Sequence, residues 1–159
     1  MSDPLVTYLH DHLGGAKFAV QLLETLADKQ RAAEPLGVFA KEHSVEIERD
    51  RMTLQKHVDR LGGNTNVTRE SSAWVAENAS NLKLDDSWSG TFQSLEMIAL
   101  GIQGKLALWG ALMMLDEDDT RIKHLPLVEL IERARVQHAR VEECRCKCAP
   151  RALQADPTN

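Results

Sequence analysis

Apolar side chains recur every three or four residues along four long segments of the chain, a spacing that predicts amphipathic helices. We expect these helices at residues 3–30, 34–61, 90–115 and 126–148. A helix with one apolar stripe must bury that stripe against other helices. The pattern therefore predicts an all-α fold, a bundle of four helices.

The ends of the first two helices carry capping signals. Asp3 precedes Pro4, and this pair is favoured at the N-cap and the first helical position. Gly62 and Gly63 follow the second helix, where glycine commonly ends a helix. Only a few residues separate the first two helices, so we expect them to be antiparallel neighbours.

The connection between the second and third helices, residues 62–89, is longer than a simple up-and-down bundle needs. Its middle, about 69–82, predicts a short extra helix, and turn-forming residues flank it. A crossover of this length lets the second and third helices run parallel. We expect one domain over residues 1–149 and a flexible tail over residues 150–159.

Bulk composition fits a single soluble domain, because 43% of the 159 residues are apolar. The net charge of -5 gives no attraction for phosphate, so we expect no nucleic-acid partner. Residues 97–115 approach the length of a membrane span. Lys105 at their centre would cost about 2.5–3.5 kcal/mol in a bilayer, so we expect a buried helix and no membrane. The N-terminus lacks the pattern of a signal peptide, which favours a cytoplasmic location.

Polar residues interrupt the apolar stripes, and this is the main chemical signal of the sequence. Four of them stand where an apolar residue is expected: His12, His43, Asp50 and His138. Glu46 shares a helix face with His43 and Asp50 because of its spacing. Glu24 and Glu96 lie close to the stripes of the first and third helices. A bundle that directs imidazoles and carboxylates inward could hold a metal.

The order of elements, over about residues 3–148, resembles the ferritin-like superfamily. That order is helix, short turn, helix, long crossover, helix, turn, helix. The opening segment from Tyr8 to Gly15, YLHDHLGG, adds to the resemblance. Di-iron members of the superfamily supply glutamate from two helices and Glu-x-x-His from the other two. The resemblance implies that Glu24 and Glu96 match the two single glutamates.

The two Glu-x-x-His motifs are absent. The second helix has the reversed order, His43-x-x-Glu46, and Arg135 stands three residues before His138 in the fourth helix. Side chains tilt toward the helix N-terminus, so the reversal displaces both donors along the axis. The resemblance therefore implies the fold of a branch with a degenerate di-iron site. We expect no cofactor. Of the two predictions, we favour a protein without enzymatic activity over an enzyme.

Three functional hypotheses follow. The first is a bundle that associates with itself, as a homodimer, or with a protein partner; the apolar third helix around Gly101 and Gly104 would serve such an interface. The second is a metal-binding protein in redox, metal storage or stress response, which would hold iron, manganese or zinc. Its ligands would be Glu24, His43, Glu46, Glu96 and His138. The third is a small-molecule binder with a pocket between helices.

Three cysteines crowd the end of the fourth helix. Cys144 and Cys148 share a helix face, whereas Cys146 points elsewhere. Structural zinc sites draw such ligands from two separated segments, and the chain has no second one. Thiol redox chemistry or a soft metal is one interpretation; the other is that Cys148 packs inward and the other two are idle.

Overall fold

A computed structural model describes residues 3–29, 34–63 and 87–154. These described residues form four long α-helices and no strand, which confirms the all-helical prediction. The helices are α1 (Pro4–Lys29), α2 (Pro35–Arg60), α4 (Trp88–Leu112) and α5 (Leu127–Leu153). The short extra helix expected near residues 69–82 lies outside the described residues.

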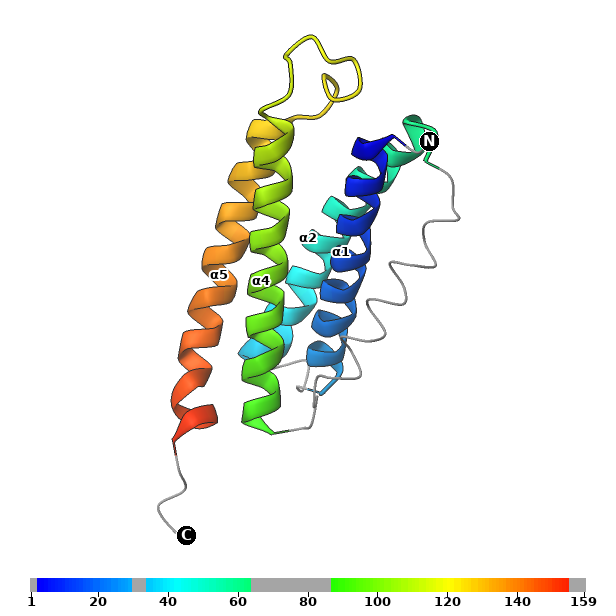
Figure 1. The fold of residues 1–159 in the computed structure, drawn as a ribbon. Coiled ribbons are helices and arrows are strands. Elements are labelled where there is room, and N and C mark those ends of the chain that lie inside the picture. Colours follow the sequence, from blue (N-terminus) through cyan, green and yellow to red (C-terminus); the bar gives the residue numbers. More distant parts are fainter. Residues whose placement is uncertain (1–2, 30–33, 64–86, 155–159) are drawn as a thin grey trace.

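The four helices lie side by side along one common direction (Figure 1). α1 packs along α2 and α4 packs along α5; α1 also contacts α4, and a smaller contact joins α2 to α5. Within each of the two main pairs the helices are antiparallel, whereas α2 and α4 run in the same direction (Figure 1). These directions are the ones that the element order predicts.

The helix ends follow the capping signals of the sequence. The Oδ1 atom of Asp3 accepts a hydrogen bond from the backbone N–H of Leu5 at 2.9 Å. At the end of α2, Gly62 adopts a left-handed φ of 72°, and the N–H of Gly63 donates to the carbonyl of Val58 at 3.1 Å. The Oγ atom of Ser87 caps α4, which begins two residues earlier than predicted.

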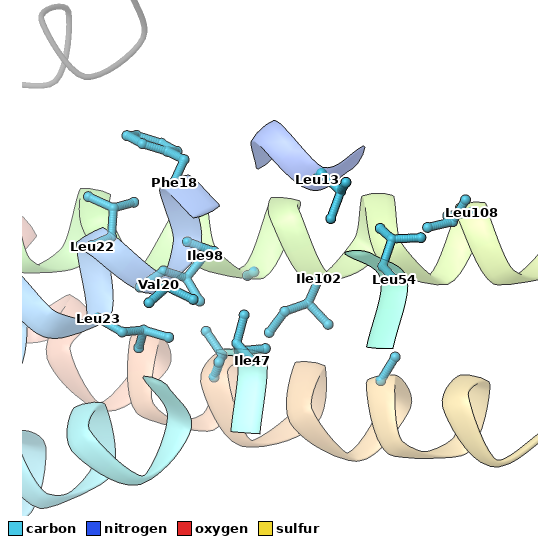
Figure 2. Close-up of a cluster of buried hydrophobic side chains, with 14 of the residues drawn as sticks. Leu13, Phe18, Val20, Leu22, Leu23, Ile47, Leu54, Ile98, Ile102 and Leu108 are labelled. Atoms are coloured by element: carbon cyan, nitrogen blue, oxygen red, sulfur yellow. The ribbon is translucent and has the colours of Figure 1, made fainter. Parts of the chain in front are cut away.

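The core is aliphatic and draws on all four helices. Figure 2 shows side chains of α1, α2 and α4 directed into the same interior. Residues withdrawn completely from solvent include Leu9, Leu23, Ala40, Val58, Leu95, Ile98, Ala134 and Val141. Burying a leucine or isoleucine side chain contributes about 1.5–3 kcal/mol, so these contacts provide most of the stabilisation.

The core stripe of α5 differs from the predicted one. The apolar pattern predicts His138 in the stripe, but the buried residues are Leu130, Ala134, Gln137, Val141 and Cys148. His138 is only half-buried. The prediction for His138 was wrong by one residue, because Ala134 and Val141 fit either choice and the apolar pattern alone does not separate them. α5 also continues through Pro150 to Leu153, into the segment expected to be a tail.

The apolar helix α4 is long enough, and apolar enough in composition, to cross a membrane. In the structure one side of α4 enters the core through residues such as Leu95, Ile98 and Ile102. The opposite side is exposed. Part of the apolar surface of α4 is therefore not covered by the other helices.

Candidate functional site

A buried carboxylate, Asp50 of α2, is the centre of a charge network between the helices. Only 3% of its side chain is exposed. Lys105 of α4 donates to its Oδ2 atom at 2.7 Å, and Arg133 of α5 donates to its Oδ1 atom at 2.7 Å. The Nε2 atom of Gln137 donates to Oδ2 at 3.1 Å. Asp50 thus joins three helices through charge-assisted hydrogen bonds.

The Lys105 ammonium holds a second acceptor in the same network. It donates to the side-chain carbonyl of Gln137 as well as to Asp50, so it lies between a carboxylate and an amide oxygen. Burial lowers the pKa of Lys105, and the charge of Asp50 opposes this effect. Burial alone would raise the pKa of the Asp50 carboxyl, but Lys105, Arg133 and Gln137 together hold it below its ordinary value. We conclude that Asp50 is ionised at neutral pH and that Lys105 neutralises it.

His43 lies on α2, seven residues before Asp50, and is fully buried. Its Nε2 atom is 3.3 Å from the backbone carbonyl of Gln137, an acceptor that requires the proton on Nε2. The Nδ1 atom has no hydrogen-bond partner in the described part of the chain. The ring stacks on Phe39 with centroids 4.5 Å apart. Burial lowers the pKa of His43, so the imidazole is neutral at neutral pH.

The residues proposed as metal ligands are not gathered at one point. Glu24 and Glu96 are exposed, and Glu46 accepts a hydrogen bond from Arg140 at 2.8 Å. His138 is half-buried and lies outside the network. Among residues 3–29, 34–63 and 87–154, no three His, Cys, Asp or Glu side chains form a group that could hold a metal ion.

Sequence reasoning found Asp50 and His43 but not their partners. Asp50 pairs with Lys105, Arg133 and Gln137, and the sequence analysis named none of these three residues as a partner of Asp50. One signal could have found Lys105: a lysine at the centre of an apolar helix needs a buried anion, and Asp50 is a carboxylate on a core stripe. Gln137 was missed because the α5 stripe was shifted by one residue.

A small cleft adjoins the network, between α1, α2 and α4. Its volume is about 50 Å³, enough for a few water molecules. Asp50, Lys105 and Trp109 line it together with His12. The rest of the lining is aliphatic or small: Gly15, Ala16, Ala19, Ile47, Leu54, Gly101, Ile102 and Leu108, beside the guanidinium of Arg51.

A wider groove of about 600 Å³ lies at the other end of the bundle, beside Cys144 and Cys148. Burial raises the pKa of the Cys144 thiol to about 12, and it also raises the pKa of Cys148. Trp88 and Arg151 line the groove, and the guanidinium lies 4.7 Å from the centre of the indole ring. Thiols with raised pKa values are poor nucleophiles, so the cysteines give this groove no reactive group.

Comparison with known proteins gives no match: no protein-family model, no curated protein and no solved structure is similar to this chain.

Proposed function

We propose that this chain is a ferritin-like helical bundle without a di-iron centre, and that it acts by self-association through the exposed face of α4. The observation that carries the proposal is the absence of charge on most of that face. A protein partner of matching shape is the alternative occupant, and the experiment below distinguishes the two.

The direction of the helices supports the ferritin-like part of the proposal. α1 and α2 are antiparallel, α2 and α4 are parallel, and α4 and α5 are antiparallel (Figure 1). A four-helix bundle with one long crossover between its second and third long helices has these directions. This support comes from the helix directions alone, so it concerns the fold and does not imply an activity.

The charge network supports the loss of a di-iron centre. A carboxylate-bridged metal pair needs several carboxylates directed at one point. In this bundle Asp50 is directed inward, but the ammonium of Lys105 and the guanidinium of Arg133 already neutralise it. A fixed organic cation thus takes the place that a metal cation would need. Glu24 and Glu96, the two matching glutamates, are exposed.

The outward face of α4 supports self-association. Its exposed residues from position 97 onward are uncharged: Leu100, Gly101, Gln103, Ala107 and Ala111, followed by Met113 and Met114 after the helix. Leu100 is 60% exposed and Met114 is 86% exposed. The exposed face of α2, in contrast, carries Lys41, Glu42, Arg49, Lys56 and Asp59. Exposed apolar side chains that follow one another along a helix face are typical of interaction sites on soluble proteins.

Small residues on this face favour a second copy of the same helix. Ala107 and Ala111 leave room for a facing backbone to approach closely, and Gly104 has no other atom within 4 Å of the position that a Cβ would take. α4 is 25 residues long, or about 37 Å, so two copies packed about a twofold axis share a long contact. A twofold interface pairs this uncharged face with itself, and no charge is left buried.

The test is the mass in solution as a function of concentration, by sedimentation equilibrium. We expect a monomer–dimer equilibrium in the wild-type chain, and a monomer for Ala107→Glu, because two introduced carboxylates would face each other across the axis. Val45→Glu is the matched control: Val45 is an exposed apolar residue of α2, 66% exposed, and the variant should dimerise normally.

Two results would overturn the proposal. A wild-type chain that stays monomeric at the highest soluble concentration has no self-association to explain. A dimer that survives Ala107→Glu but dissociates in Val45→Glu places the interface on α2. If the chain is monomeric but retains a defined protein from its own cells, and Ala107→Glu loses it, the face serves a partner.

The metal-binding alternative has a separate test. Elemental mass spectrometry of untagged protein, after exposure to Fe(II), Mn(II) and Zn(II), measures the bound metal directly. A stoichiometric metal that disappears in a His43→Ala, His138→Ala double variant would support the alternative. We expect no metal above background, because the Lys105 ammonium repels a cation placed beside Asp50.

A further inference from the structure

The cleft between α1, α2 and α4 contains hydrogen-bond donors without matching acceptors. Trp109 is 1% exposed, and its Nε1–H has no partner in the described part of the chain. Trp109 lines the cleft together with Lys105. An ammonium has three N–H donors, and Asp50 and Gln137 take two of those of Lys105. The oxygen atoms of Asp50 already accept from three side chains, so the cleft has donors to offer and few acceptors.

The charges beside the cleft also favour an acceptor ligand. The single negative charge of Asp50 faces two cations, Lys105 and Arg133, at 2.7 Å each. The network therefore carries one excess positive charge. An anion that reaches Lys105 would balance this charge in a region that excludes most water, where the attraction is stronger than at the surface.

The walls of the cleft limit the ligand to a small and partly apolar molecule. Its volume of about 50 Å³ admits only a few heavy atoms, and Ile102 and Leu108 line it on the α4 side. Figure 2 shows Ile102 directed from α4 toward Ile47 of α2, and Leu108 further along α4, beside Leu54. A doubly charged anion such as phosphate would bring more charge and more acceptors than these walls can satisfy.

We propose that this cleft binds a short-chain monocarboxylate. The carboxylate accepts from the Trp109 Nε1–H and the Lys105 ammonium, and the alkyl chain lies against Ala16 and Ala19. Gly15 and Gly101 keep the cleft open: a Cβ at Gly15 would meet no atom within 4 Å, and one at Gly101 would meet only Ala19, at 3.9 Å. Of the residues that line this cleft, Gly101 also belongs to the α4 face proposed for self-association, and the other lining residues do not.

The experiment is a titration with formate and acetate followed by heteronuclear NMR. We expect the indole N–H resonance of Trp109 to shift in a saturable manner, and Trp109→Phe to identify that resonance by its loss. The neutral amide of the same chain length, acetamide, and potassium chloride at the same ionic strength are the ligand controls. We expect acetate to bind more tightly than acetamide by about tenfold, because the carboxylate meets a charged donor.

Two variants test the location of the site without removing a charge. Gly101→Leu places a side chain at the cleft and should abolish the acetate response. Gly110→Leu is the matched control: Gly110 lies in the same helix, has no atom within 4 Å of its missing Cβ, and does not line the cleft. Equal binding of acetate and acetamide, an acetate response that persists in Gly101→Leu, or no saturable shift at the Trp109 indole would each overturn the proposal.

Discussion

The ammonium nitrogen of Lys105 lies 2.7 Å from the Oδ2 atom of Asp50, and this ion pair joins α4 to α2 inside the bundle. The exposed fractions of the two side chains are 13% and 3%. Removing two charges from water is costly, and their attraction offsets the cost only when the remaining hydrogen-bonding groups are satisfied. Here Arg133 and Gln137 donate further hydrogen bonds to Asp50, and the side-chain carbonyl of Gln137 accepts from Lys105. The pair therefore favours one alignment of the helices over others that would leave a charge buried alone.

Asp50→Asn should destabilise the fold strongly. The substitution keeps the shape of the side chain but leaves the Lys105 ammonium buried without a counter-charge. Breaking a buried ion pair from one side costs about 3–5 kcal/mol. Urea denaturation followed by circular dichroism measures the free energy of unfolding. A loss below about 1 kcal/mol would show that water reaches the network and screens it.

Two further variants test whether the unpaired buried ammonium, and not merely the loss of a carboxylate, destabilises Asp50→Asn. Glu48→Gln removes a carboxylate of the same helix that pairs with Arg51 near the surface, and it should change the free energy of unfolding by about 0.5 kcal/mol or less. The double variant Asp50→Leu, Lys105→Met removes both charges. It should be more stable than Asp50→Asn, because no unpaired ammonium remains between the helices.

Acidification should weaken the fold through its buried histidines. Burial lowers the pKa of His43 and of His57 below the ordinary 6.5. The unfolded chain then binds protons at a higher pH than the folded chain does. The stabilisation is complete above about pH 6.5 and is lost as the pH falls through the lowered folded values. Urea titrations at about pH 7.5, 6.5 and 5.5 should give a free energy of unfolding that decreases in that order.

Charged neighbours also shift the pKa of each of these two histidines. Arg140 and Lys105 lower the pKa of His43 further, whereas Glu46 raises it. Arg60 and His124 lower the pKa of His57. His57→Gln should therefore reduce the dependence of stability on pH. An unchanged pH dependence in this variant would assign the acid sensitivity to other groups.

The helices were predictable because their signals are local. The spacing of apolar residues gave all four helices, and Asp3 and Gly62 marked two of their ends as the structure has them. The burial of His43 and Asp50 also followed from the stripe of α2. Each of these statements concerns one helix and its own periodicity.

The partners of Asp50 were not predictable in the same way. They lie 55 and 83 residues away in the sequence, at Lys105 and Arg133, and only the packing of three helices brings them together. A shift of one residue on α5 exchanges His138 for Gln137 in the core, and the apolar pattern fits both choices almost equally. Gln137 hydrogen-bonds with Asp50 and Lys105 on other helices, and helix periodicity carries no information about partners on other helices.

Gly63→Ala should destabilise the end of α2. An added Cβ would lie 2.5 Å from Cγ1 of Val58 and 2.9 Å from Nε2 of His10, both of which are buried. Overpacking of this kind costs about 1–3 kcal/mol. Gly110→Ala is the opposite case: with no atom within 4 Å, alanine should stabilise α4 by about 0.5–1 kcal/mol. The melting temperatures of the two variants should therefore move in opposite directions, and a shift of both in the same direction would contradict the packing around Gly63.

The three cysteines should differ in reactivity although they lie on one helix. Cys146 is exposed, Cys144 is half-buried with a pKa raised to about 12, and Cys148 is buried. The thiolate is the reactive form, so iodoacetamide at neutral pH should alkylate Cys146 first. Peptide mapping by mass spectrometry after a short exposure identifies the modified residue, and Cys146→Ser should remove the fast reaction. Rapid alkylation of Cys144 in the folded chain would show that the thiols of this helix face are more accessible than their burial implies. Thiol chemistry in the groove beside them would then again be a hypothesis to test.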